Sequence, residues 1–138
     1  MKLFLLILLT FSLTMAACSS SDPASTVTTP TATTITETFP GTVQVSGVSF
    51  SPFNVSQPGT VNVTLTAAGP PSTIWMGVGI GTPSATTCAV IQADTTVTPA
   101  GATAQLSGTL SAGSYCVQVY DVGNQAAPVT YSVTVAHT

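Results

Sequence analysis

Hydrophobic and polar residues alternate in short runs along most of the chain after its first 38 residues. The clearest run is residues 60–66, in which Val61, Val63 and Leu65 share one face and polar residues share the other. Successive side chains of a strand point to opposite faces, so this alternation predicts a β-strand with one buried face. No segment keeps a helical period over a useful length.

Runs of this kind recur between clusters of turn residues, and they predict a series of strands. We expect strands at residues 42–48, 49–55, 60–66, 74–80, 87–92, 103–110, 114–121 and 129–136. Gly, Pro, Asn and Ser separate the runs, as is typical of turns between short strands. The pattern therefore predicts an all-β fold, an antiparallel β-sandwich of about eight strands. Both a jelly-roll order and an immunoglobulin-like order fit the pattern.

Residues 1–17 follow a different pattern, in which Lys2 precedes an apolar run that ends in small residues. The run is shorter than the roughly 20 apolar residues of a membrane-spanning helix. A cation, an apolar stretch and small residues, in that order, are typical of a secretory signal peptide. We therefore expect the protein to be exported.

The end of this segment, Met15-Ala16-Ala17-Cys18, resembles the lipobox of bacterial lipoproteins. In that family the cysteine becomes the first residue and carries a diacylglycerol thioether. Met15 departs from the family, which usually has Leu there. The resemblance implies a lipid anchor on Cys18 and, because Ser19 follows rather than Asp, a place in the outer membrane or at the cell surface. The alternative is an ordinary signal peptide cut nearby.

Residues 18–38 are rich in Ser, Thr and Pro and contain no aromatic residue. Such a segment offers nothing to a packed core, so we expect a tether. Residues 39–138 are enough for one domain with its own core. The predicted organisation is thus a signal peptide, a lipidated cysteine with its tether, and one β-sandwich.

Charge is scarce, since charged residues make up 4% of the chain and Lys2 is its only Lys or Arg. Removal of the signal peptide would leave no Lys or Arg at all. Binding to nucleic acid depends on several cations that displace counterions from phosphates, so that function class is excluded. A hydrophobic content of 44% with so little charge also argues against disorder of the whole chain.

Several segments of the domain resemble the bacterial pre-peptidase C-terminal domain. They are Phe50 with Phe53-x-Val55, then residues 59–65, 113–121 and 131–135. The resemblance rests on strand periodicity with a few glycines and aromatic residues. It implies a small jelly-roll-like accessory domain of secreted proteins, some of which bind calcium or extracellular polymers. Residues 74–80, Ile-Trp-Met-Gly-Val-Gly-Ile, depart from the Asp-rich central strand that is common in the family.

Two cysteines, Cys88 and Cys116, fall within the predicted domain. In exported domains such a pair most often forms a disulfide, and we expect one here. Closing this loop would stabilise the fold by about 3 to 4 kcal/mol in the chain-entropy model. Cys116 alternates with Tyr115 and Val117, so we expect the bridge to lie outside the main core.

The ionisable residues offer little for catalysis, and we expect no enzymatic activity. His137 is the only histidine and stands beside the chain end, where we expect fraying. Glycosidases need two carboxylates about 5 to 10 Å apart. Glu37 falls in the predicted tether and Asp94 in a predicted Thr-rich loop, so we expect no such pair.

Asp121 and Asn124 lie in a short segment between two predicted strands. They are weak candidates for calcium, which takes six to eight oxygen ligands. We instead expect an Asx-type turn with Gly or Asn at positive φ. We expect no other cofactor.

Trp75 is the only tryptophan, and it shares a strand face with Gly77 and Gly79. We expect its ring to pack over these glycines, because a buried Trp contributes a large apolar area. The alternative is an exposed aromatic platform for a sugar ring or an apolar partner.

These features together indicate a non-catalytic, lipid-anchored protein of the cell envelope. The leading hypothesis is a sandwich that binds an envelope glycan or a protein partner. A second is a structural component that pairs through its edge strands. A small metal-dependent hydrolase is the third.

Overall fold

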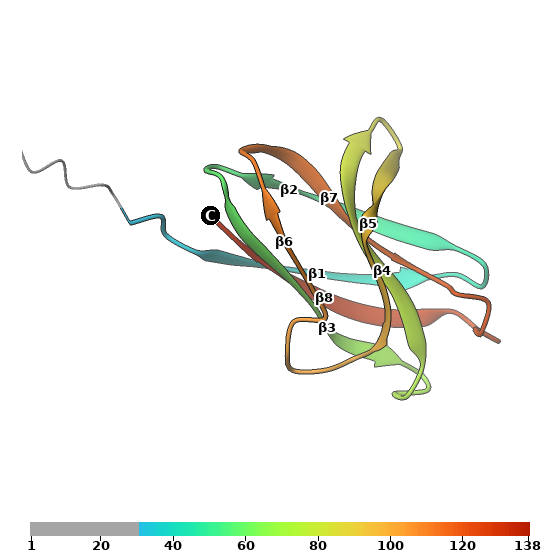
Figure 1. Ribbon diagram of the computed structural model, residues 1–138. Helices are drawn as coiled ribbons and strands as arrows, with labels where there is room; N and C mark the ends of the chain where they lie inside the picture. Colours follow the sequence, from blue (N-terminus) through green and yellow to red (C-terminus); the bar gives the residue numbers. More distant parts are fainter. Residues whose placement is uncertain (1–30) are drawn as a thin grey trace, which may run out of the picture. The chain divides into compact units, whose positions relative to one another are not determined.

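A computed structural model describes residues 31–138, so the predicted signal peptide, Cys18 and most of the predicted tether lie outside the described residues. The described part contains eight strands and no helix. They form two four-stranded antiparallel sheets, which pack as two layers (Figure 1). The predicted all-β sandwich is confirmed. None of residues 31–138 belongs to a helix that could span a bilayer.

Each sheet draws its strands from both halves of the chain. Sheet A consists, in spatial order, of β1 (Ile35–Val43), β8 (Val129–His137), β3 (Gly59–Gly69) and β6 (Leu106–Leu110). Sheet B consists of β2 (Val48–Val55), β7 (Gly113–Tyr120), β4 (Trp75–Ser84) and β5 (Thr87–Pro99).

The order in which the strands pair distinguishes the jelly-roll topology from the immunoglobulin-like topology, both of which fit the sequence pattern. β1 pairs with β8, β2 with β7, β3 with β6 and β4 with β5, as in one long hairpin. Rolling this hairpin up adds the pairs β3–β8 and β4–β7. This is the jelly-roll arrangement of eight strands in two sheets.

The first strand lies earlier in the chain than the sequence pattern predicts. β1 covers Ile35–Val43, and β2 begins at Val48, so the predicted strand at 42–48 is wrong. The last four residues of the predicted tether, 35–38, are also in β1. The core-facing positions of β1 include Glu37 and Gly41, which interrupt the apolar alternation that reveals the other strands.

Alternate residues of the strands meet between the sheets and form one hydrophobic core. Val61, Val63 and Leu65 of β3 are fully buried, as their alternation predicts. Met76, Val78 and Ile80 of β4 face them from sheet B. The other core members are Val43, Phe53, Val55, Ala68, Ile74, Leu106, Leu110, Val117, Val119, Val129, Tyr131, Val133 and Val135.

A polar contact joins the first and last strands at one end of this core. His137 Nε2 lies 2.8 Å from Glu37 Oε1, and the His137 side chain is fully buried. The Phe53 ring lies 5.4 Å from the His137 ring between centroids. The predictions of a frayed His137 and of Glu37 in the tether are therefore wrong, because strand pairing of β1 with β8 orders both residues.

The predicted disulfide is confirmed between Cys88 and Cys116, whose Cα atoms are 6.0 Å apart. Cys116 lies between Pro52 of β2 and Gly81 of β4 in the strand register. It alternates with the core residue Val117 and so faces away from the space between the sheets, as predicted. The bridge thus ties β5 to β7 on the outer side of sheet B.

We expect the double variant C88S/C116S to fold with lower stability. The bridge closes a loop over a sequence separation of 28 residues. Its loss is expected to reduce the free energy of unfolding by about 3 to 4 kcal/mol, because the unfolded chain regains the entropy of the open loop. Urea unfolding measures this, with reduced wild-type protein as the control. Equal unfolding midpoints for oxidised wild type and variant would contradict the prediction.

Candidate functional site

The two outer faces of the sandwich differ in chemistry. Outward positions of sheet A are mostly Thr, Ser and Asn, as in the row formed by Thr38, Thr134 and Thr64 across three strands. Several outward positions of sheet B instead carry large apolar or aromatic side chains. Among them Val48 is 57%, Trp75 52% and Val97 47% exposed. This exposed apolar surface makes sheet B the candidate for ligand binding.

The strand register gives the layout of this surface, which we call the outer face of sheet B. Three rows cross β2, β7, β4 and β5 in turn, and Trp75 lies beyond the first row on β4. The rows are Val48–Tyr120–Gly77–Val97, Phe50–Gln118–Gly79–Thr95 and Pro52–Cys116–Gly81–Val90.

Strand β4 contributes a glycine to each row, and its neighbours lie directly on these glycines. A Cβ atom at Gly77 would overlap the Tyr120 ring, and one at Gly81 would overlap the backbone of Ala89. At Gly79 it would lie 2.8 Å from Val90 Cγ1. The space that the missing side chains leave is therefore filled by β5 and β7.

The expectation that Trp75 packs over the glycines is wrong. The Tyr120 ring occupies the place above Gly77, and Trp75 remains about half exposed at the start of β4. The ring is therefore exposed, and its use as a platform for a sugar ring or an apolar partner stays a prediction. Asn124 Nδ2 donates a hydrogen bond to the Trp75 carbonyl at 3.0 Å and holds the backbone at this point.

The pairing of β5 with β4 is interrupted by a large bulge in β5. Gly79 pairs with Thr95 and Gly81 with Val90, so the four residues 91–94 of β5 stand opposite the single residue Ile80 of β4. Asp94 belongs to this bulge within β5, so its predicted place in a loop is wrong. Bulges of this kind bend a strand and redirect its side chains.

Beyond the bulge, the end of the β4–β5 hairpin bends over the outer face of sheet B. We call residues 82–89 the hairpin tip; it projects from the sandwich in Figure 1. Three observations place its β5 side over the face. The Ala89 backbone lies against Gly81, Cys88 is bonded to Cys116, and residues 86–88 line a hollow with Phe50.

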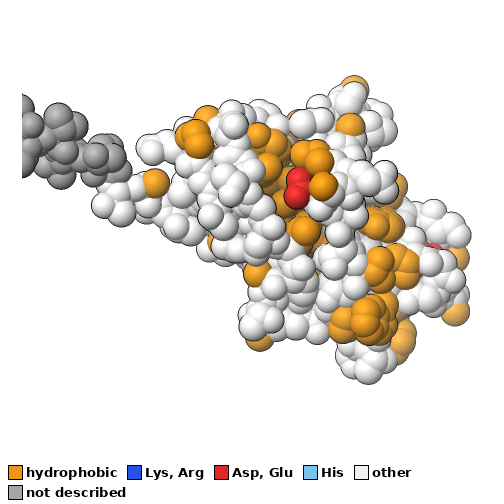
Figure 2. Space-filling model, viewed as in Figure 1, with side chains coloured by type: hydrophobic (Ala, Val, Ile, Leu, Met, Phe, Trp, Pro, Cys, Tyr) orange, Lys and Arg blue, Asp and Glu red, His pale blue; other side chains and the backbone are white. Residues whose placement is uncertain are grey.

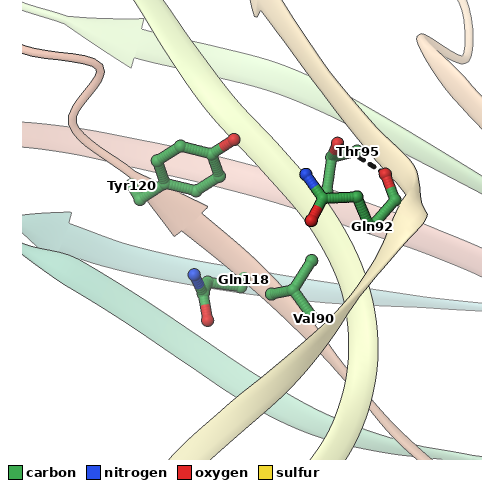
Figure 3. Close-up of a pocket in the computed structure, with 5 residues that line it drawn as sticks. All are labelled: Val90, Gln92, Thr95, Gln118 and Tyr120. Carbon is green, nitrogen blue, oxygen red and sulfur yellow. Dashed lines mark hydrogen bonds between the residues drawn. The ribbon is translucent and has the colours of Figure 1, made fainter.

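Two hollows lie on this face. The first has a volume of about 220 Å³ and is lined by Val90, Gln92, Thr95, Gln118 and Tyr120 (Figure 3). The second has a volume of about 320 Å³ and is lined by Val48, Phe50, Thr86, Thr87, Cys88 and Gln118. Gln118 belongs to both, so the hollows adjoin at its side chain.

The polar groups of the first hollow are amides and hydroxyls. The Thr95 hydroxyl donates to the Gln92 carbonyl at 3.3 Å, and Figure 3 shows no other hydrogen bond among the five lining residues. The Tyr120 hydroxyl and the Gln92 and Gln118 amides are thus not paired with one another. Neither hollow is lined by Asp, Glu, His, Lys or Arg.

The wider surface is equally poor in charge. On the face drawn in Figure 2, acidic groups are sparse and no cationic side chain is visible. Residues 31–138 contain neither Lys nor Arg. The site therefore suits an uncharged ligand that has both apolar patches and hydrogen-bonding groups.

Asp121 forms the turn that the sequence predicts. Its Oδ1 accepts hydrogen bonds from the amides of Gly123, Asn124 and Gln125 at 2.8, 3.1 and 3.3 Å, and Oδ2 accepts one from Ser46 at 2.7 Å. Gly123 has a φ of 90°, so the predicted Asx-type turn is confirmed. The Ser46 amide above all, with the other three amides, lowers the pKa of Asp121 from its ordinary value of 3.8.

Metal binding gains no new support from this arrangement. Within residues 31–138, no three side chains of His, Cys, Asp or Glu gather into a metal-binding group. Asp121 and Asn124 already bond to backbone groups. Calcium at these residues stays a prediction.

The structure brings some of the residues singled out in the sequence together and separates others. Cys88 and Cys116 border the hollows, and Trp75 lies on the same face. His137 and Glu37 instead lie on β8 and β1 of sheet A. Tyr120 and Gln118 carry no motif of their own in the sequence, but the alternation that turns Cys116 outward places them on the same side.

The chain was compared with known proteins. No protein-family model matches it, and no curated protein matches it in sequence. The resemblance to the pre-peptidase C-terminal domain stays a prediction.

We expect Asp121→Asn to lower the melting temperature in a pH-dependent way. The carboxylate makes charge-assisted hydrogen bonds that a neutral amide replaces only weakly. Because folding lowers the pKa of Asp121 below 3.8, this contribution is present above that pH and is lost as the pH falls through the folded pKa. The difference in melting temperature between wild type and variant should therefore be largest at neutral pH.

Calorimetry from pH 7 to pH 2 measures this difference. Asp94→Asn removes the same charge from β5 and is the matched control. A gap between wild type and D121N that stays constant down to pH 2 would contradict the assignment.

Proposed function

We propose that this protein is a non-catalytic module of the cell envelope that binds an uncharged glycan on the outer face of sheet B. The observation that carries the proposal is the exposed Trp75 on the same face as hollows lined by amides and hydroxyls. Glycan is favoured over a protein partner by this mixture of an aromatic ring with small polar hollows.

The chemistry of sugars fits this surface. A pyranose ring has apolar C–H faces and a rim of hydroxyl groups, each of which both donates and accepts hydrogen bonds. An exposed indole offers a flat apolar surface with a polar N–H at one edge. Gln side chains offer donors and acceptors together, which match hydroxyl groups.

The edges of the sandwich argue against the alternative of a structural component that pairs through edge strands. The edge strands are β1 and β6 of sheet A and β2 and β5 of sheet B. β1 contains Pro40, β2 contains Pro52, β5 contains the wide bulge, and β6 has only five residues. Proline, bulges and short strands are the features that prevent edge-to-edge pairing.

A hydrolytic function is disfavoured by the placement of the ionisable groups. In the described part of the chain the single histidine is buried, and its Nε2 is bonded to Glu37. No carboxylate lines either hollow of the outer face. We therefore propose binding without turnover.

We further propose that the module is held at the membrane by a lipid on Cys18. The support is the lipobox-like sequence before Cys18 and the Ser/Thr-rich segment that separates it from β1. More than one acyl chain on the cysteine would give stable anchoring, which one chain does not. The expected location is the outer membrane or the cell surface.

We expect Trp75→Ala to weaken binding of a neutral oligosaccharide about tenfold, because the sugar loses its aromatic surface. Calorimetric titration with cellohexaose, xylohexaose, chitohexaose and maltohexaose measures this. Val45→Ala, which shortens an exposed apolar side chain in the turn between β1 and β2, is the matched control. Failure of wild type to bind any of the four, or equal affinities of wild type and W75A, would refute the proposed function.

We expect the mature protein to begin at Cys18 and to carry acyl chains. Intact mass spectrometry of protein extracted from membranes should show the mass of residues 18–138 plus the lipid. Cys18→Ser should move the protein to the soluble fraction, because the thioether cannot form. An unmodified mass, or membrane retention of C18S, would contradict lipid anchoring.

A further inference from the structure

The two hollows on the outer face of sheet B meet at one side chain. Gln118 of β7 lines both of them, with the wall of β5 on one side and β2 with the hairpin tip on the other. In the strand register Gln118 pairs with Phe50 on β2 and with Gly79 on β4. Its amide therefore stands near the middle of the sheet, between the two hollows.

The sizes of the hollows bear on the ligand. Pockets for drug-sized ligands measure about 300 to 1,000 Å³. The first hollow, at about 220 Å³, is below this range, and the second, at about 320 Å³, is at its lower end. Each therefore suits one small unit, and two adjoining hollows suit a ligand built of linked small units.

The hairpin tip forms one wall of the second hollow. Thr86, Thr87 and Cys88 face Val48 and Phe50 there. The Cys88–Cys116 bridge holds this wall against the sheet, and Gly81 allows the β5 backbone to pass directly over β4. The second hollow thus depends on a covalent tie as well as on packing.

We propose that the outer face of sheet B binds a chain of at least two linked neutral sugar units, one in each hollow, and that the Gln118 amide contacts both. This inference rests on the proposed function. It adds a minimum length for the bound oligosaccharide and names the residue that distinguishes it from a single sugar. Gln118 is then a specificity-determining residue for oligosaccharides over single sugars.

The chemistry of a glutamine amide supports this role. Its two N–H donors and the two lone pairs of its oxygen can serve hydroxyl groups on both sides at once. A charged side chain in the same place would favour charged ligands, but the hollows contain no Asp, Glu, His, Lys or Arg. Each hollow also has one aromatic side chain in its lining, Tyr120 in the first and Phe50 in the second.

Titration of wild type and variants with sugars of increasing length tests the inference. The ligands are the monosaccharide, disaccharide and hexasaccharide of whichever glycan the wild type binds among the four hexaoses. For wild type, affinity should rise from the monosaccharide to the disaccharide as the second hollow is filled. Gln118→Ala should weaken hexasaccharide binding about tenfold through the loss of its hydrogen bonds.

Gln44→Ala, in the turn between β1 and β2, is the matched control and should bind as wild type does. Phe50→Ala provides a second test that does not depend on Gln118. It removes one side of the second hollow and should lower affinity for the hexasaccharide. Melting curves confirm that each variant is folded.

The outcomes separate this inference from the proposed function. If wild type binds a hexasaccharide but Q118A and F50A bind it as tightly as Q44A does, the two-hollow inference is overturned and glycan binding stands. Equal wild-type affinities for the monosaccharide and the disaccharide overturn it as well. If wild type binds none of the hexaoses, the proposed function fails first.

Discussion

Strand β4 carries glycine at three successive outward positions, and its neighbours in sheet B lie directly against its backbone. The Tyr120 ring covers Gly77, and the β5 chain passes over Gly81. Any side chain at these two positions would collide with them, so the bend of the hairpin tip requires glycine at 81. The place of the Tyr120 ring and of the hairpin tip on the outer face of sheet B depends on this close approach.

Stability in this domain comes almost entirely from apolar burial, backbone pairing and one covalent tie. Among residues 31–138, the contact between His137 Nε2 and Glu37 Oε1 joins the first strand to the last. Exposed ion pairs contribute little in most proteins, so their scarcity costs little stability. The outer face of sheet A carries uncharged hydroxyl groups in place of charged ones.

The same lack of charge sets the character of the proposed binding. Without cationic or anionic patches, association is not accelerated by electrostatic steering, and salt should affect it little. Affinity then depends on aromatic contact and on hydrogen bonds to amides and hydroxyls. Many copies anchored on one surface would compensate for modest affinity at each site, because several would engage one polymer together.

Sequence alone determined the features that depend on local pattern. Alternation predicted the sandwich, seven of the strands in approximate position, and the buried face of Val61, Val63 and Leu65. The pair Cys88–Cys116 and the turn at Asp121 followed from the chemistry of those residue types. β1 escaped prediction because Glu37 breaks its alternation, and the place of Glu37 in a strand follows from the pairing of β1 with β8.

What only the tertiary structure decided depends on contacts between distant strands. The jelly-roll order follows from which strands pair, and the periodicity within a strand does not carry that information. Trp75 is exposed because Tyr120, 45 positions later in the chain, fills the place above Gly77. The hollows exist because the bulge of β5 and the bridge to Cys116 bring the hairpin tip over the sheet. No local pattern specifies these contacts between distant strands, because the free energy that favours them comes from packing between segments far apart in the sequence.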